Sequence, residues 1–298
     1  MVKLQPETRV RLKNILFLTD FSWASDTVIP FVREIAERYE GNVIALHVTV
    51  PDPLNYMTPE SPLAALESQN DFALAEMKKV EAQLAGIPNH VVVTAGNNVW
   101  SVVRSMLQAE HIDLILVGTH CRTGLPKLLM GSTAEEVFRR SPVPVMTVGP
   151  SVIPAQVPHT GWQRILFASD FTAEAGAAAP FAVSFAEENK AQLILLHVIE
   201  AMGSRKDKKH QALTVAEALH RLHEIVPAEA ELWCRPETVA EHGDPATQIL
   251  KVANEKKVDL IVLGIRNNGP VTVVSHLEKT IAHTVLAHAA CPVLTVRS

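Results

Sequence analysis

The stretch that decides the fold is KNILFLTDFS at residues 13–22, because it returns as QRILFASDFT at residues 163–172. Each version reads as a short apolar strand followed by a hydroxyl residue, an aspartate and a phenylalanine. The offset between the two versions is 150 residues. Other pairs follow at similar offsets, among them LHV at 46–48 and 196–198, and DLILVG at 113–118 with DLIVLG at 259–264. The chain is therefore an internal repeat of two copies.

A segment rich in proline separates the two copies. GPSVIPAQVP at residues 149–158 holds three prolines in ten residues, which stiffens it toward an extended linker. We expect a first domain at residues 1–150, the end of the linker at 151–162 and a second domain at 163–298. A chain of 298 residues has the length of two ordinary domains.

Composition excludes several classes of protein. The 27 basic and 32 acidic side chains give a net charge of −5, which argues against nucleic acid as a partner. No apolar run reaches the roughly 20 residues of a membrane helix, and the first residues lack the apolar core of a secretory signal. The three cysteines are widely spaced, which fits neither a disulfide framework nor a zinc site. We therefore expect a cytoplasmic protein that does not associate with membranes.

Apolar runs alternate with amphipathic stretches in each copy. In the first copy the expected strands are residues 15–18, 43–50, 91–94, 114–117 and 143–148, and the expected helices are 25–39, 63–84, 99–110 and 133–139. Such alternation predicts an α/β fold with a parallel sheet and right-handed crossovers. Pro30 and Pro180 lie inside the expected first helices, where they either widen an early turn or delay the start of the helix.

Polar and glycine residues follow the first and fourth expected strands. Asp20 and Asp170 come just after the first strand of each copy, and Gly118 and Gly264 just after the fourth. In open parallel sheets, ligands bind outside the carboxyl ends of strands where the strand order reverses. If the first strand neighbours the fourth, one carboxylate and one glycine loop face a shared crevice.

The stretch GTHCRTGLPKLLMGS at residues 118–132 is the strongest candidate for a binding motif. Glycine after a strand allows a close approach of backbone to a ligand. Gly131–Ser132 opens an expected helix, whose free N–H groups and positive dipole end suit a phosphate. The stretch matches neither the Walker loop nor the dinucleotide-binding fingerprint.

With these motifs on both copies, the chain resembles the universal stress protein family in its tandem form. Nucleotide-binding members of that family show G-2x-G-9x-G-[ST]. Gly118 takes the first place here, Gly131–Ser132 take the last pair, and Cys121 stands at the middle glycine. The resemblance implies two flavodoxin-like domains of the adenine nucleotide alpha hydrolase-like kind. Each would be a five-stranded parallel sheet of order 3-2-1-4-5 with helices on both faces.

The resemblance also implies ATP, with or without Mg²⁺, as the ligand of the first copy. Its phosphates would lie on Gly118 and Gly131–Ser132, its ribose near Asp20, and its adenine edge at the backbone of Val48. Cys121 places a side chain where the family has glycine and could crowd the phosphates.

The second copy keeps only part of this pattern. Asp170, Val198 and Gly264 remain as remnants of a site, but alignment places Lys279–Thr280 where the first copy has Gly131–Ser132. The spacing from the strand-end glycine is 15 residues instead of 13. We therefore expect the second copy to bind ATP poorly or not at all.

Other candidate residues have simpler interpretations. His47 and His197 match between the copies, which favours hydrogen-bonded strand-end histidines over a catalytic pair. RKDKKH at residues 205–210 reads as a solvated loop, with an anion or nucleic-acid contact as the alternative. No nucleophile elbow is present, so we name no catalytic residue and no metal ligand. Enzyme activity stays open, with slow ATP hydrolysis as the most that we expect.

Two functions fit the sequence. The first is a stress-response regulator that binds ATP in its first domain, and the alternative is a scaffold of the same fold that acts through protein–protein contacts. In the family, the final strands meet across a two-fold axis. The two copies would therefore form an intramolecular pseudo-dimer, and a homodimer of whole chains is open.

Overall fold

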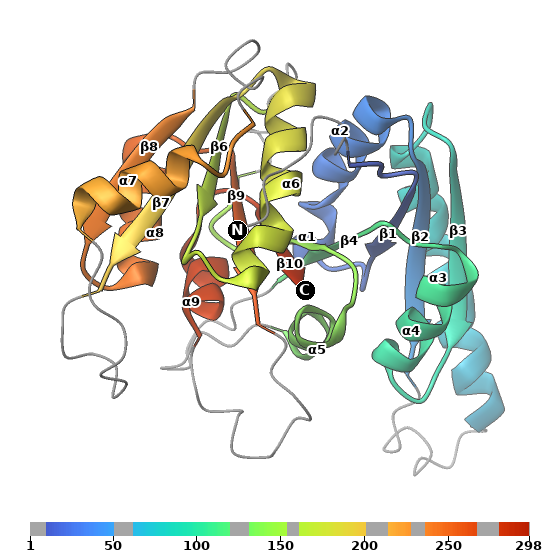
Figure 1. Cartoon of the computed structure of the whole chain (residues 1–298). Helices are drawn as coiled ribbons and strands as arrows, with labels where there is room; N and C mark the ends of the chain where they lie inside the picture. The colour runs from blue at the N-terminus through green and yellow to red at the C-terminus, as the bar shows by residue number, and fades with distance from the viewer. Residues whose placement is uncertain are drawn as a thin grey trace. The chain divides into compact units, whose positions relative to one another are not determined.

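The computed structural model describes residues 10–50, 62–119, 131–153, 161–200, 214–227, 236–266 and 280–297. These residues divide into two compact units that correspond to the two copies of the sequence (Figure 1). One unit holds the described residues from Arg11 to Val148, and the other holds those from Gly149 onward together with Val10. The finer domain limits expected at residues 150 and 163 stay a prediction.

Strands and helices alternate along the first unit. The strands are β1 (Asn14–Leu18), β2 (Asn42–Thr49), β3 (Asn89–Ala95), β4 (Leu114–Gly118) and β5 (Val145–Val148). The helices are α1 (Trp23–Asp26), α2 (Ile29–Tyr39), α3 (Pro62–Gln83), α4 (Val99–Ala109) and α5 (Ser132–Arg140). Neighbouring strands pair in parallel in the order β3-β2-β1-β4-β5, which confirms the order that the family resemblance implies.

The second unit repeats this arrangement. Its strands are β6 (Arg164–Ala168), β7 (Gln192–Ile199), β8 (Glu237–His242), β9 (Leu260–Ile265) and β10 (Val293–Arg297). Its helices are α6 (Ala173–Asn189), α7 (Val215–His223), α8 (Pro245–Glu255) and α9 (Ile281–His288). The order β8-β7-β6-β9-β10 is again parallel throughout.

Each sheet is covered by helices on both faces, as its apolar strands require. In the first unit, Leu16 and Ile115 lie in a buried cluster with Trp100 and Val103 of α4 and Val137 of α5. Because successive side chains of a strand point to opposite faces, the neighbours of Leu16 point toward the face that α2 and α3 cover. None of the helices in the described part of the chain is long and apolar enough to span a membrane.

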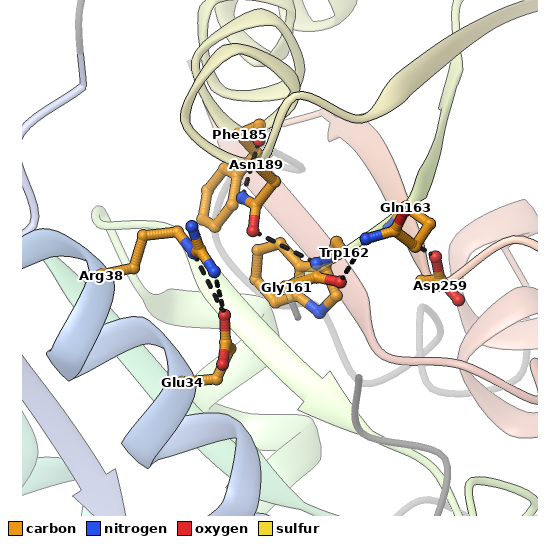
Figure 2. A network of polar contacts seen from close by, with 8 residues as sticks. All are labelled: Glu34, Arg38, Gly161, Trp162, Gln163, Phe185, Asn189 and Asp259. Atoms are coloured by element: carbon orange, nitrogen blue, oxygen red, sulfur yellow. Dashed lines mark hydrogen bonds and ion pairs between the residues drawn. The ribbon is translucent and has the colours of Figure 1, made fainter. Parts of the chain in front are cut away.

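An aspartate before the fourth strand fixes the register of each sheet. Asp259 Oδ2 accepts the backbone N–H of Gln163 at 2.8 Å (Figure 2). Asp113 Oδ2 does the same for Lys13 at 2.7 Å in the first unit. These bonds join the start of β6 to β9 and the start of β1 to β4. The residues that follow the other ends of the same strands are thereby placed side by side.

A buried tryptophan anchors the start of the second unit. The backbone N–H of Trp162 donates to Asn189 Oδ1 at 3.2 Å, and the side-chain amide of Asn189 donates to the carbonyl of Phe185 at 2.8 Å (Figure 2). The rings of Trp162 and Phe185 pack with centroids 4.9 Å apart. This cluster fixes the end of α6 to the residues that lead into β6.

The first helix differs between the copies and from the expected range of 25–39. In the first unit the chain forms the short α1, turns at Thr27 and Val28, and starts α2 with Pro30 in its first turn. In the second unit α6 is continuous and contains Pro180 in its interior. Pro30 therefore coincides with a delayed helix start, whereas Pro180 is accommodated within a helix.

Candidate functional site

Asp20 is held at the carboxyl end of β1 by two serines. Its Oδ1 accepts the hydroxyls of Ser22 and Ser25, each at 2.5 Å, and the backbone N–H of Ser22 at 3.1 Å. The backbone N–H of Asp20 donates to Ser25 Oγ at 3.1 Å. Asp20 is nevertheless exposed to solvent. The turn therefore presents an oriented carboxylate at the surface.

The residue after Asp20 has an unusual backbone conformation. Phe21 has a φ of 61°, in the left-handed region that bulky residues rarely adopt. Its N–H donates to Thr19 Oγ1 at 3.1 Å, and its ring stacks on the His47 imidazole with centroids 4.2 Å apart. These contacts offset the local strain, which costs about 1–2 kcal/mol.

The two matching histidines are strand-end hydrogen-bond donors, as the sequence favoured. His47 Nδ1 lies 2.9 Å from the carbonyl oxygen of Thr19, and His197 Nδ1 lies 2.7 Å from that of Ser169. Because a carbonyl only accepts, each Nδ1 carries the proton. Burial lowers the pKa of His197, with a smaller contribution from the Arg221 charge. The imidazoles orient the turn that contains the aspartate.

Gly118 is required by a helix that passes close to the end of β4. A Cβ at Gly118 would lie 2.4 Å from the carbonyl oxygen of Ala24 and 3.1 Å from the backbone nitrogen of Ser25. Since the Ser25 hydroxyl also bonds Asp20, the structure brings Gly118 and Asp20 close together, at the carboxyl ends of the adjacent strands β4 and β1. The close approach that sequence reasoning assigned to a ligand is made by α1, and a ligand contact of Gly118 stays a prediction.

Gly131 and Ser132 lie at the start of α5, as the sequence predicted for this helix. Gly131 is the N-cap residue and has no side chain that could cap the first turn. Among the described residues, no atom lies within 4 Å of the position of an added Cβ at Gly131. The first N–H groups of α5 are the kind of donors that bind an anion at a helix start.

Two other predicted site residues are less informative. Val48 lies near the end of β2, pairs with Thr94 of β3 and is partly buried. Cys121 lies outside the described residues, so its effect on the site stays a prediction.

The electrostatics of this region divide the site into two parts. Burial raises the pKa of Asp26, and the charges of Glu76 and Asp20 raise it further. Carboxylates at the end of β1 accept hydrogen bonds from hydroxyl groups and repel phosphates, whereas the start of α5 attracts phosphates. Across the described residues, no cluster of three or more histidine, cysteine or acidic side chains could hold a metal ion.

In the second unit Asp170 has different partners. Its Oδ1 accepts the hydroxyl of Thr172 at 2.6 Å and the backbone N–H of Thr172 at 3.0 Å. Ala175 stands at the position of Ser25 and offers no hydroxyl. The guanidinium of Arg266, just after β9, lies 4.0 Å from Asp170 Oδ2. A cation of the chain therefore occupies the neighbourhood of this carboxylate.

The aromatic stack is repeated with a cation added. Phe171 has the same φ of 61°, and its ring lies 4.4 Å from the His197 ring. The guanidinium carbon of Arg221 on α7 lies 4.1 Å from the centroid of the Phe171 ring. In the first unit the ring that contacts Phe21 is Phe72 of α3, edge-on at 6.3 Å.

The other two residues predicted for the second copy, Gly264 and Val198, lie like their counterparts in the first copy. A Cβ at Gly264 would lie 2.3 Å from the carbonyl oxygen of Glu174, so this glycine serves the same packing as Gly118. Val198 pairs with Glu241 and is partly buried, like Val48.

The start of α9 differs most from its counterpart. Thr280 is the N-cap of α9, and its Oγ1 accepts the backbone N–H of His283 at 3.3 Å. The structure thus gives Thr280 the place of Gly131, one residue away from the alignment by sequence, while Lys279 lies outside the described residues. A helix start that is capped by its own threonine has fewer N–H groups to offer an anion.

Sequence reasoning missed Ser25, Arg221 and the role of Arg266. Comparison of the copies could have identified Ser25, because the repeat places Ala175 at its position. No local pattern pairs Arg221 with Phe171, which lies 50 residues earlier in the chain.

The fold and the site define a tandem α/β protein with two flavodoxin-like parallel sheets and an aspartate turn at the end of each first strand. The family model described as "Universal stress protein family" matches residues 11–149 and 161–297. The chain therefore belongs to the universal stress protein family.

Individual relatives agree with this assignment. A universal stress protein of Mycolicibacterium smegmatis is 24% identical over 296 residues, which cover 95% of this chain and 97% of the relative. Universal stress protein YxiE of Bacillus subtilis is 30% identical over 159 residues, covering 46% of this chain and 99% of the relative. The crystal structure of a universal stress protein from Archaeoglobus fulgidus has a TM-score of 0.73 at 23% identity and covers 97% of this chain and 98% of that one. The last likeness shows the fold.

Proposed function

We propose that this chain is a stress-response regulator that binds ATP in its first copy. The observation that carries the proposal is the exposed carboxylate of Asp20, fixed by Ser22 and Ser25 beside Gly118. This turn lies where the strand order reverses, between β1 and β4, the place where open parallel sheets bind ligands.

Each part of the nucleotide has a matching group. The ribose hydroxyls would donate to the Asp20 carboxylate, and such bonds to a charged acceptor contribute about 1.5–3 kcal/mol. The phosphates would lie at the uncapped start of α5, at Gly131–Ser132. The backbone of Val48 would contact the adenine edge.

The second copy lacks two of these groups. Thr280 caps α9 with its own hydroxyl, and Arg266 lies beside the carboxylate that a ribose would use. We therefore propose one ATP site per chain.

Isothermal titration with ATP tests this proposal. We expect one site per chain in the wild type and an affinity at least about tenfold lower in Asp20→Asn, which removes a charged acceptor. Asp170→Asn is the matched control and should leave the ATP affinity of the first copy unchanged. Repeating the titration in EDTA tells whether Mg²⁺ takes part. No heat and no thermal shift at millimolar ATP would defeat the proposal.

A scaffold that lacks a nucleotide is the second candidate, favoured by Cys121 at the family's middle glycine. Nucleotide that co-purifies with the protein supports the first function, and an empty protein at saturating ATP supports the scaffold. Slow ATP hydrolysis is tested by phosphate release, which should exceed the buffer rate and fall in Asp20→Ala if the first copy is an enzyme.

Assembly and location are further parts of the proposal. We propose an intramolecular pseudo-dimer of the two copies in the cytoplasm, and sedimentation would show whether whole chains also pair. The mass expected for a single chain is 32.6 kDa.

A further inference from the structure

The turn after β6 collects two arginines that the proposed ATP site does not use. Arg221 comes from α7 and contacts Phe171, and Arg266 comes from the end of β9 and contacts Asp170. Because Asp170 and Phe171 are consecutive residues, both guanidinium groups lie at the same turn. The charges of Arg221 and Asp170 also both act on the pKa of His197, whose ring stacks on Phe171.

Arg221 is held in place without using its hydrogen-bonding capacity. In the part of the chain that the structure describes, its guanidinium makes no hydrogen bond or ion pair. Its Cζ lies 4.1 Å from the centroid of the Phe171 ring, in a cation–π contact. The ring contact takes up none of the five N–H donors of the guanidinium. Donors in this fork are the groups with which arginine binds two oxygens of an anion.

The Arg266 guanidinium is oriented by Asp170, but the contact between them is long and exposed to solvent. Its ion pair with Asp170 spans 4.0 Å, and the two side chains are 58% and 56% exposed. Exposed ion pairs of this kind contribute little to stability, so a stronger anion can displace the carboxylate. The backbone is better fixed, because the carbonyl of Arg266 accepts the Arg297 guanidinium at 3.0 Å.

We propose that the second copy contains an anion site, in which Arg221 and Arg266 bind a phosphate-bearing small molecule beside Phe171. The planar fork of each arginine matches the oxygens of a phosphate group. The site goes beyond the proposed function, because it lies in the copy that is not expected to bind ATP. In the first unit the α3 side chain that contacts Phe21 is the aromatic Phe72, so among the described residues a cation on this phenylalanine is found in the second copy.

The same residues explain why phosphate, and not ribose, is recognised. Arginine N–H groups only donate, so Arg221 and Arg266 match the acceptor oxygens of a phosphate, whereas Asp170 lies in a weak ion pair with Arg266. The ligand would thus be held by its charge, and binding should weaken with added salt.

Titration of inorganic pyrophosphate into the full chain at low ionic strength tests the site. We expect Arg221→Gln and Arg266→Gln each to weaken binding to the second copy by about tenfold, and the double variant to remove this component of pyrophosphate binding. Arg104→Gln is the matched control, since Arg104 is an exposed arginine of α4 and should leave binding within about twofold. Unchanged melting curves would show that the variants fold.

Two further variants distinguish specific binding by the arginine forks from nonspecific attraction to positive charge. Arg221→Lys keeps the charge but loses the fork and should still weaken binding by about fivefold. Asp170→Asn removes the internal competitor of the anion and should tighten pyrophosphate binding by about two- to fivefold.

The opposite results would overturn the inference. No binding at several millimolar pyrophosphate would do so, and so would equal binding by wild type and the double arginine variant, which would assign pyrophosphate to the first copy. Failure of the proposed function looks different, because absence of ATP binding with intact, arginine-dependent pyrophosphate binding would defeat only the ATP site.

Discussion

The two copies share backbone conformations and differ in the side chains at the carboxyl ends of their strands. In each sheet an aspartate before the fourth strand, Asp113 or Asp259, accepts a backbone N–H from the residue that precedes the first strand. Both have a phenylalanine at a φ of 61° after the strand-end aspartate. Both need a glycine where a helix passes close to the fourth strand. These shared features belong to the fold.

The differences concentrate at the carboxyl ends of the strands. Ser25 of the first copy is replaced by Ala175, and the cap of the last helix changes from Gly131 to Thr280. The cation Arg221 contacts the stacked phenylalanine in the second copy only, within the described residues. The same fold therefore carries two different sets of charged groups at the carboxyl ends of its strands.

The largest predicted effect tests what the copies share. Gly118→Ala and Gly264→Ala should each destabilise their unit by about 3 kcal/mol, because the new Cβ would lie 2.4 or 2.3 Å from a helix carbonyl. Urea unfolding followed by circular dichroism measures the change. Gly131→Ala is the control and should cost less than about 1 kcal/mol. If both variants were as stable as the wild type, the helix would not approach the fourth strand as closely as described.

The next largest effect tests the difference between Ser25 and Ala175 at the aspartate turns of the two copies. Ser25→Ala should cost about 2 kcal/mol, since it removes hydroxyl bonds to and from Asp20. It should also weaken ATP binding, because the carboxylate loses its orientation. The reciprocal variant Ala175→Ser, measured in the same urea experiment, should change stability by less than about 0.5 kcal/mol. Equal effects of the two variants would contradict the difference between the turns.

The prolines of the first helices should respond unequally. Pro180→Ala restores an N–H for the carbonyl of Gly176, four residues earlier, and should stabilise α6 by about 1 kcal/mol. Pro30→Ala lies in the first turn of α2, where proline is well tolerated, and should change stability by less than about 0.5 kcal/mol. Thermal unfolding of both variants measures the comparison, and a destabilised Pro180→Ala would contradict it.

The smallest effect is a difference in pH dependence between matching helix caps. Asp244 caps α8, and the Thr247 backbone N–H, followed by its hydroxyl, lowers the pKa of Asp244. Its folded pKa lies below the unfolded value of about 3.9, so the cap stabilises above that pH and is lost as pH falls through the folded pKa. Asn98 caps α4 and does not titrate.

Acid unfolding of Asp244→Asn measures this contribution. The variant should retain a cap, because asparagine also caps helices. Its free energy of unfolding should depend less on pH below pH 4, by less than about 1 kcal/mol. Asn98→Asp should introduce the same dependence into the first unit. An unchanged acid profile in both variants would contradict the assignment.

The repeat and the apolar strands made the architecture predictable from the sequence. Strands covered on both faces are nearly all apolar, so their limits and the position of Asp20 at a strand end could be inferred. The match between His47 and His197 also predicted their hydrogen bonds. These features depend on short-range patterns that occur twice.

The remaining features depend on contacts that no local pattern records. The break between α1 and α2 includes the Thr27 hydroxyl, which donates to the carbonyl of Ala24 at 2.7 Å. The φ of Phe21 is stabilised by a ring from another strand. Arg221 meets Phe171 only through the fold.

A crystal structure of the chain soaked with ATP tests the central claim most directly. The claim predicts nucleotide density in the first copy alone, with the ribose within hydrogen-bond distance of Asp20 and the phosphates at the start of α5. Nucleotide bound at Asp170, or an empty first crevice at saturating ATP, would contradict it.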